Sequence, residues 1–174
     1  MASFMDRVVG AARLDVRTYE EVEADGTATG QAMAVVVLSS VAAGIGSGEG
    51  RLLLGALGAL VGWFLWAFLC YVIGTKLLPE AQTRGDVGEL LRTIGFASAP
   101  GILRVFGFLP LVGGLIMLVT GVWMLATTVV AVRQALDYTS TLRAIGVCIV
   151  GWLVLVIWAL LVAGVIGGGA LLFG

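Results

Sequence analysis

The chain has 174 residues, of which 60% are hydrophobic and 12% charged, and its mean hydropathy is +1.08. Soluble domains carry about 25% charged residues, so a soluble core of this length could not bury so much apolar surface. The net charge is -1 and no basic cluster occurs, which excludes the charge pattern of a nucleic-acid-binding protein. The sequence has no His, and its two Cys, Cys70 and Cys148, lie in separate apolar runs. The usual ligands of zinc, haem and iron–sulfur clusters are therefore missing, and we expect no metal or cofactor.

Hydrophobic runs of membrane-spanning length predict an all-α fold, a polytopic integral membrane helix bundle. Residues 1–26 are expected to form a cytoplasmic amphipathic and acidic segment, and residues 27–174 a single transmembrane domain. Because the first segment lacks the long apolar core of a signal peptide, the first span is expected to act as the targeting signal. The five expected spans are residues 28–46, 52–73, 94–109, 114–132 and 144–166.

Apolar and charged residues after Met1 recur with the period of an α-helix. The stretch from Ser3 to Leu14 predicts a short amphipathic helix in the headgroup layer, and the alternative is a frayed terminus. Asp6, Arg7 and Arg13 are expected on its polar side. The apolar side would carry Phe4, Met5, Val8, Val9 and Ala12.

An acidic stretch comes directly before the first span. Thr18 followed by Glu21 has the spacing of a capping box, which predicts that a helix starts near Tyr19. The carboxylates there either stabilise the positive end of that helix or form a docking surface for a cytosolic partner. The candidate partner-binding residues are Tyr19, Glu20, Glu21, Glu23 and Asp25.

Glycines recur at helical spacing in the second and fifth spans. Small residues four apart let two membrane helices approach closely, so we expect these glycines to pack against other helices, another membrane protein or a second copy. The candidate helix-packing residues are Gly55, Gly58, Gly62, Gly164 and Gly168.

The run 94–109 is short and interrupted. As an α-helix it would extend about 24 Å, against a hydrocarbon core of about 30 Å. Pro100 and Pro110 are expected to kink or end it, and Arg104 inside it adds about 3 kcal/mol to the free energy of insertion. Arg104 therefore either snorkels to an interface or finds backbone carbonyls, loop carboxylates, a protein partner or a lipid phosphate.

The distribution of Lys and Arg decides between five spans and four. With run 94–109 crossing, eight of these residues lie on the side of the N-terminus and only Arg51 on the other. With that run on the surface, the division becomes six against three. We therefore expect five transmembrane helices with a cytoplasmic N-terminus, in the cytoplasmic (inner) membrane if the cell is prokaryotic.

Several stretches resemble the Yip1 domain family in its short prokaryotic form. They are Leu14–Ala32, the Phe96-Ala97-Ser98-Ala99-Pro100 run, and Pro110, Val112, Gly113, Gly114, Trp123, Ala131 and Gln134-Ala135-Leu136 through the fourth span. The resemblance implies a five-helix bundle with a cytoplasmic N-terminus. Eukaryotic relatives bind prenylated Rab-type GTPases, chiefly through a long cytoplasmic N-terminal region, whereas residues 1–26 form a short one here.

No catalytic pattern occurs in the sequence. Ser98 and Thr127 have no His to activate them, and no phosphate-binding loop is present, so we expect no enzyme. The first functional hypothesis is a scaffold, accessory subunit or adaptor that contacts lipids, another membrane protein and a cytosolic partner. The alternatives are an uncoupled lipid or small-solute conduit through the Pro100–Arg104 segment, and a membrane-shaping role of the N-terminal helix.

Overall fold

The computed structural model describes residues 2–48 and 50–172, with side-chain surroundings up to Leu161. Every regular element in this part of the chain is helical. Between the long helices lie a 3₁₀ turn, η1, a π-helical turn, η2, and a 3₁₀ helix, η3. In chain order the elements are α1 (Phe4–Ala12), α2 (Val16–Ala24), η1 (Gly26–Ala28), α3 (Thr29–Ser47), α4 (Leu52–Val72), η2 (Ile73–Leu77), α5 (Val87–Ala97), η3 (Ala99–Phe108), α6 (Gly113–Ala135) and α7 (Thr141–Leu172).

Four helical stretches are long and apolar enough to cross a membrane. They correspond to the predicted first, second, fourth and fifth spans, so the multi-pass helical architecture is confirmed. The predicted third span, 94–109, is divided between the end of α5 and η3 and is not one α-helix. The four stretches are Gly26–Ser47, Leu52–Leu77, Gly113–Ala135 and Thr141–Leu161.

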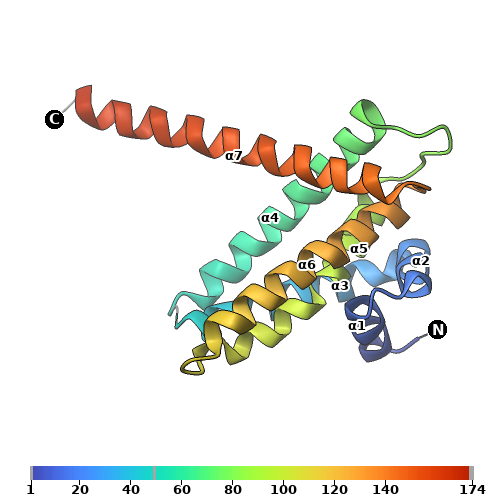
Figure 1. Cartoon of the computed structure of the whole chain (residues 1–174), viewed down its shortest axis with the longest axis horizontal. Helices are drawn as coiled ribbons and strands as arrows, with labels where there is room; N and C mark the ends of the chain where they lie inside the picture. Colours follow the sequence, from blue (N-terminus) through green and yellow to red (C-terminus); the bar gives the residue numbers. More distant parts are fainter. Residues whose placement is uncertain (1, 49, 173–174) are drawn as a thin grey trace.

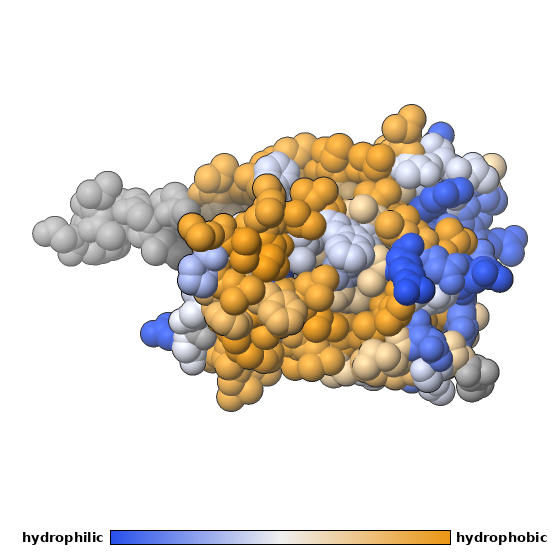
Figure 2. Space-filling model, turned by 60° about the horizontal axis from the view of Figure 1, so that its bottom comes forward, coloured by the Kyte–Doolittle hydropathy of each residue, from blue (hydrophilic) through white to orange (hydrophobic). Residues whose placement is uncertain are grey.

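Polar and apolar residues separate along the long axis of the bundle. Most hydrophilic residues gather at one end, and a mainly apolar surface covers the rest of the face in view (Figure 2). The polar end comprises α1, α2, the connection 78–86, the N-terminus of α5 and the loop 136–140. The opposite end, which we call the turn end, carries the connections 48–51 and 109–112 (Figure 1). This distribution is typical of a membrane protein whose short helices and polar connections gather on one side of the membrane.

The α5–η3 segment follows α3 along its length. A Cβ atom on Gly95 would lie 2.7 Å from the Cβ of Ala32, and one on Gly101 would lie 2.0 Å from the Ser39 Oγ. Near the turn end, a Cβ on Gly46 would lie 1.8 Å from the Arg104 carbonyl oxygen. The segment therefore runs from the polar end to the turn end beside α3.

The break between α5 and η3 lies inside the bundle, where orphaned backbone groups need a partner. Thr127 of α6 supplies one, because its buried hydroxyl lies 2.7 Å from the Ala97 carbonyl oxygen and donates to it. Pro100 stands at the start of η3, where its missing N–H leaves no helical bond unmade. Pro110 lies in the turn between η3 and α6, so it ends η3 and kinks no helix.

The start of α2 differs from the sequence prediction. Asp15 is the N-cap, and its side chain accepts from the Arg17 N–H, so the helix starts at Val16. The predicted capping box of Thr18 and Glu21 is wrong, since the Thr18 hydroxyl donates to Asp15 Oδ2 at 3.1 Å instead. Asp15 precedes the predicted cap by three residues, and a charged acceptor there competes successfully with a hydroxyl.

α1 is amphipathic as predicted, but Arg7 does not lie on a solvated side. The Arg7 side chain is 2% exposed and faces α2 and α3, whereas Met5 is 64% exposed. The prediction of Arg7 on a polar outer face is therefore wrong, because carboxylates of α2 bind it inside the protein. α1 keeps an exposed apolar side, which suits a helix at a membrane interface.

Candidate functional site

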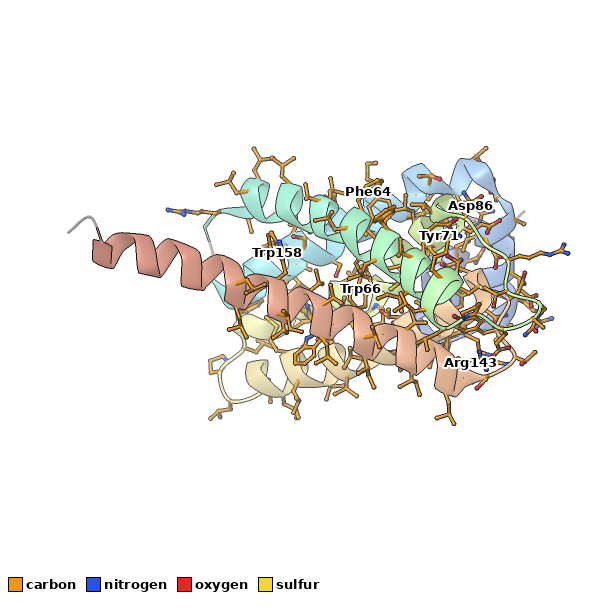
Figure 3. All side chains as sticks on the ribbon, turned by 90° about the horizontal axis from the view of Figure 1, so that it is seen from above. Phe64, Trp66, Tyr71, Asp86, Arg143 and Trp158 are labelled. Atoms are coloured by element: carbon orange, nitrogen blue, oxygen red, sulfur yellow. The ribbon has the colours of Figure 1, made fainter. Side chains whose placement is uncertain are left out.

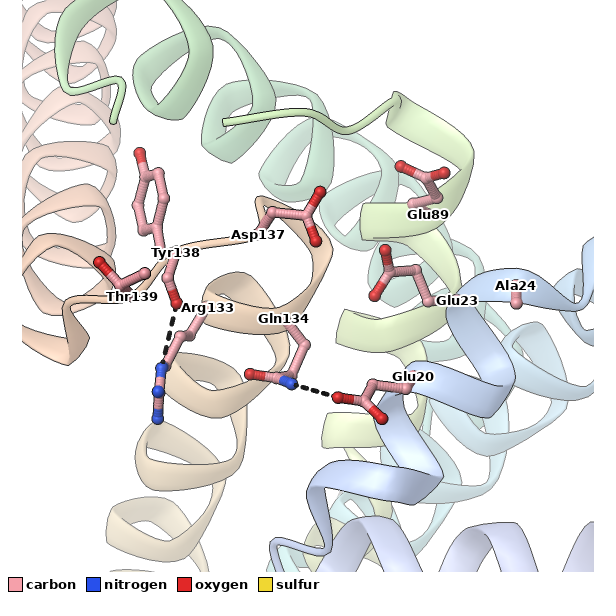
Figure 4. A pocket seen from close by; sticks show the side chains of 9 residues that line it. All are labelled: Glu20, Glu23, Ala24, Glu89, Arg133, Gln134, Asp137, Tyr138 and Thr139. Atoms are coloured by element: carbon pink, nitrogen blue, oxygen red, sulfur yellow. Dashed lines mark hydrogen bonds between the residues drawn. The ribbon is translucent and has the colours of Figure 1, made fainter. Parts of the chain in front are cut away.

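A cavity of about 640 Å³ lies at the polar end. Carboxylates of Glu20, Glu23, Glu89 and Asp137 line it together with the Arg133 guanidinium (Figure 4). We call this cavity the acidic pocket. Its remaining lining residues are Ala24, Gln134, Tyr138 and Thr139.

Hydrogen bonds between helices hold the walls of the acidic pocket. Arg92 of α5 donates from Nε to the carbonyl oxygens of Val22 (3.0 Å) and Glu23 (3.1 Å), at the end of α2 where the helix dipole favours a cation. Gln134 of α6 donates to Glu20 Oε1 at 3.3 Å. Large side chains that are fully buried, among them Tyr19 and Phe96, pack beneath these helices. The pocket is thus built on a packed core.

The loop 136–140 closes one side of the pocket and is itself fixed. The Tyr138 hydroxyl lies 2.9 Å from the Gly74 carbonyl oxygen and 2.8 Å from that of Leu78. Glu80 accepts from the backbone N–H (2.9 Å) and the hydroxyl (2.7 Å) of Thr139. These bonds with Thr139 lower the pKa of the Glu80 carboxyl to about 2. Asp137 is therefore held at the pocket by contacts on its C-terminal side.

The surroundings of the acidic pocket disfavour the ionised form of its half-buried acid, Glu23. Burial, together with the charges of Glu89, Asp137 and Glu20, raises the pKa of Glu23 to about 7, and the Arg92 guanidinium only partly opposes this shift. Arg133 lies at the edge, with its Nε donating to the Tyr138 carbonyl oxygen at 3.3 Å. Near neutral pH the pocket therefore binds and releases a proton, and a cation entering it would favour release.

The raised pKa of Glu23 predicts a pH-dependent effect of Glu23→Gln. A carboxyl whose pKa is raised on folding contributes stability below about pH 4.5, and loses it as pH rises through about 7. Glu23→Gln should therefore match the wild type at pH 5 and exceed it in Tm by about 3 °C at pH 8. Thermal unfolding in detergent at the two pH values measures this.

Glu80→Gln serves as the control of opposite sign. Its pKa of about 2 keeps Glu80 ionised and bound to Thr139 at both pH 5 and pH 8. Glu80→Gln should therefore lower Tm at both values, with no crossover. An equal effect of Glu23→Gln at both pH values would contradict the electrostatic description of the pocket.

The five predicted partner-binding residues do not share one surface. Tyr19 is fully buried, its hydroxyl donates to the Ala11 carbonyl oxygen at 3.0 Å, and burial raises its pKa. Glu21 and Asp25 each accept from Arg7 at 2.8 Å. Hydrogen bonds from Thr27 and Arg7 lower the pKa of Asp25 to about 2. Of the five, Glu20 and Glu23 line the acidic pocket, and the docking role of the set remains a prediction.

The sequence analysis missed Glu89, Asp137 and Arg133 as members of the pocket. They lie on α5, in loop 136–140 and on α6, far from α2 in sequence. One pattern in the sequence could have indicated them. Each of these charged residues stands where a predicted helix meets a polar connection, and in an up-and-down bundle those connections lie at the same end. Among the described residues no group of three or more His, Cys, Asp or Glu is arranged to hold a metal ion.

The predicted packing glycines of α4 do not contact another helix of this chain closely. A Cβ on Gly58 or Gly62 would meet nothing within 4 Å, and one on Gly55 would meet only the Ser40 Oγ at 3.8 Å. Their packing role remains a prediction for a neighbouring protein. Gly164 and Gly168 belong to the part of α7 whose packing lies outside the described residues.

Arg104 lies on η3 inside the bundle and is half-buried. Its Nε donates to the Thr120 hydroxyl of α6 at 3.3 Å. It lines two cavities, of about 420 Å³ and about 780 Å³, which share Trp66, Arg104, Met124 and Thr128. The predicted contact residue is therefore at a cavity wall, and its partner remains a prediction.

Comparisons with known proteins identify the family. The family model of the Yip1 domain matches residues 15–163, which is most of the chain. Searches of curated proteins and of solved structures found no match. The match runs from the N-cap of α2 into α7, so it includes the acidic pocket and the Arg104 cavities. This chain, whose described part contains four helices able to cross a membrane, therefore belongs to the Yip1 domain family of membrane proteins.

Proposed function

We propose that this protein is a non-catalytic membrane adaptor whose acidic pocket receives a basic segment of a cytosolic partner. The observation that carries this proposal is the convergence of Glu20, Glu23, Glu89 and Asp137 on one cavity at the polar end. A Lys or Arg side chain between these carboxylates would relieve the repulsion that raises the pKa of Glu23. Binding of the partner would thus replace repulsion between the carboxylates by attraction between these carboxylates and its basic side chains.

We propose further that α5 and η3 together make a fifth crossing. A 3₁₀ helix rises about 2.0 Å per residue, so the ten residues of η3 extend about 20 Å, against about 15 Å in an α-helix. With about 6 Å from Ile94 to Ala97, the broken segment reaches about 26 Å, which is nearer to the hydrocarbon core thickness of about 30 Å than the about 24 Å of an uninterrupted α-helix. Its course beside α3 from the polar end to the turn end supports this reading.

Five crossings place the polar end in the cytoplasm. Eight Lys and Arg residues then lie at the polar end and Arg51 alone at the turn end, which follows the positive-inside rule. The N-terminal segment would be cytoplasmic, as a pocket for a cytosolic partner requires. In a prokaryotic cell the membrane would be the cytoplasmic (inner) one.

The exposed glycine face of α4 suits a second interaction, within the membrane. Gly58 and Gly62 have open space where a Cβ would stand, so another helix could approach there. We propose that this face contacts another membrane protein or a second copy, as a scaffold or accessory subunit would.

The adaptor proposal is tested with a fluorescent ten-residue peptide rich in Lys and Arg. The protein is placed in nanodiscs of zwitterionic lipid, and fluorescence anisotropy measures peptide affinity. The wild type should bind more tightly at pH 8 than at pH 6, because Glu23 is ionised at the higher pH. Combining Glu20→Gln, Glu23→Gln and Asp137→Asn should weaken binding by about tenfold or more.

Glu49→Gln is the control for loss of a carboxylate that does not line the acidic pocket. It removes one charge, where the triple variant removes three, from the stretch of sequence between α3 and α4. Its affinity should equal that of the wild type. Equal binding by the triple variant and the wild type would exclude the acidic pocket as the docking site.

The conduit hypothesis receives less support than the adaptor. A lipid path needs a continuous passage between the two leaflets, and the two cavities at Arg104 reach toward the polar end no further than Ile94, Val129 and Ile145. Beyond them the fully buried Leu90 and Val132 fill the interior. Vesicles containing the protein should therefore scramble a fluorescent lipid, read by dithionite reduction, no faster than protein-free vesicles.

A further inference from the structure

The Arg104 guanidinium lies inside the bundle, below the apolar surface of the turn end. It bonds Thr120, seven residues into α6 and about 10 Å from the start of that helix. Beyond it, the turn end exposes the apolar side chains of Phe108 (60%) and Leu111 (104%). These side chains belong in lipid, so the guanidinium lies below the level at which water would surround it.

The described protein satisfies little of the hydrogen-bonding capacity of Arg104. A guanidinium carries five N–H donors, and one bond, to the Thr120 hydroxyl, is formed within the described residues. No carboxylate of these residues forms an ion pair with Arg104. Except for Glu49, every acidic residue of the sequence belongs to the polar end. An acceptor from outside the chain would complete the coordination of Arg104.

Three cavities form a series, and Arg104 lines two of them. A cavity of about 280 Å³ at the turn end is lined by Ser47 and Arg51, and it shares Ser40 and Ala43 with the cavity of about 420 Å³. That cavity lies between α3, α4, α5, η3 and α6, and Ser39, Ser40, Ser98 and Thr128 stand among its mainly apolar lining residues. Connected cavities therefore lead from Arg51 at the turn end to the guanidinium.

The cavity of about 780 Å³ continues from Arg104 as an apolar groove between α6 and α7. Trp66 of α4 forms its base and packs where Gly151 of α7 leaves room, as a Cβ there would lie 3.1 Å from the indole (Figure 3). Its volume is within the range of about 300–1,000 Å³ that is usual for small-molecule sites. The other apolar lining residues are Met124, Leu125, Val129, Ile145, Cys148, Ile149, Trp152, Leu153 and Leu155.

We propose that this Arg104 groove binds one anionic phospholipid from the leaflet at the turn end. The phosphate accepts hydrogen bonds from the Arg104 guanidinium, whose planar fork matches two phosphate oxygens. The headgroup lies in the cavities toward Arg51, and an acyl chain lies in the apolar groove between α6 and α7. Because the fully buried Leu90 and Val132 fill the interior toward the polar end, the lipid is held and does not pass through.

The positive charge selects the occupant. A sterol or the α7 helix of a second copy would fill the apolar groove but would leave the Arg104 donors unpaired. A zwitterionic lipid would place the cationic amine of its headgroup beside the two cations Arg104 and Arg51. An anionic phospholipid satisfies both the charge and the apolar wall. This site is separate from the acidic pocket, and the inference does not depend on the adaptor role.

Native mass spectrometry tests the proposal. The protein is released from mixed micelles containing equal amounts of phosphatidylglycerol and phosphatidylcholine, and the lipids retained per monomer are counted. The wild type should retain one phosphatidylglycerol in preference to phosphatidylcholine. Arg104→Gln should reduce this preference about tenfold, the effect of one charge-assisted contact. Arg133→Gln, which removes the same charge at the polar end, should not change it.

Two further variants separate lipid binding from folding and from other occupants. Ile149→Trp fills the groove and leaves Arg104 in place, so retention of the lipid should fall although the charge is present. Arg104→Lys should fold and retain the lipid less tightly than the wild type. Equal retention of both lipids by the wild type would overturn the proposal, as would a dimer without lipid or displacement of the lipid by inorganic phosphate alone.

Discussion

Gly46→Ala is expected to lower the free energy of unfolding by about 3 kcal/mol, the upper range for overpacking a core. The added Cβ would lie 1.8 Å from the Arg104 carbonyl oxygen and 3.1 Å from the Gly107 nitrogen. Both are backbone atoms of η3, so no side chain can rotate away to make room. Either α3 moves from η3 or the broken segment shifts, and Arg104 leaves its cavities in both cases.

Gly58→Ala is the matched control. A Cβ at Gly58 meets nothing within 4 Å, and alanine is favoured over glycine within a helix by about 0.5–1 kcal/mol. The monomer in detergent should therefore be as stable as the wild type or slightly more stable. Unfolding with increasing denaturing detergent, followed by circular dichroism, compares the two variants. A loss for Gly58→Ala equal to that for Gly46→Ala would contradict the observed register of α3 and η3.

Arg7→Met is expected to lower the free energy of unfolding by about 2–3 kcal/mol, because hydrogen bonds with charged groups are among the stronger ones. Arg7 is 2% exposed and donates to Glu21, to Asp25 and to the Gln31 side-chain oxygen at 3.0 Å. Removing the guanidinium leaves two carboxylates close together with no cation between them. α1 and α2 would lose their common attachment to α3.

Arg17→Met tests the same substitution at a solvated position. The Arg17 side chain is 92% exposed and its nearest carboxylate oxygen, on Asp15, is 3.9 Å away. Exposed pairs of this kind contribute about 0–1 kcal/mol, so little change in unfolding is expected. Hydrogen exchange of residues 4–24 should increase for Arg7→Met and remain unchanged for Arg17→Met. Equal exchange in both would show that α1 does not depend on the Arg7 contacts.

The four long crossings could be predicted because a membrane span is a local property. About twenty consecutive apolar residues suffice, whatever the rest of the chain does. The run 94–109 was harder, since its length in ångströms depends on the type of helix it adopts. The 3₁₀ conformation of η3 beside α3 gives it a greater rise per residue than the α-helix assumed from the sequence.

The roles of individual glycines could not be read from the sequence. Gly58 and Gly62 have the spacing of a packing motif and face open space, whereas Gly101, which has no glycine four residues away, would meet the Ser39 side chain closely. Close approach depends on which helix lies opposite and at what register. That information comes from tertiary packing, which a spacing of four residues along one helix does not contain.

The acidic pocket shows the same limit for charged residues. The sequence predicts a docking surface from the acidic residues around Tyr19, but periodicity along α2 could not show that Tyr19 is buried in the core. Nor could it show that Arg7 of α1 would bind Glu21 and Asp25. Glu23 lines a pocket because tertiary packing brings Glu89 of α5 and Asp137 of the loop after α6 to the same cavity.

The central claim is that residues 87–108 carry the chain across the membrane. Single cysteines in place of Gly50, Gln82, Leu111 and Thr139, with Cys70 and Cys148 replaced by alanine, test it through labelling of intact cells by an impermeant maleimide. Positions 50 and 111 should react from outside, and positions 82 and 139 only after the membrane is opened. Labelling of position 139 from outside, with position 111 protected, would show that this segment does not cross.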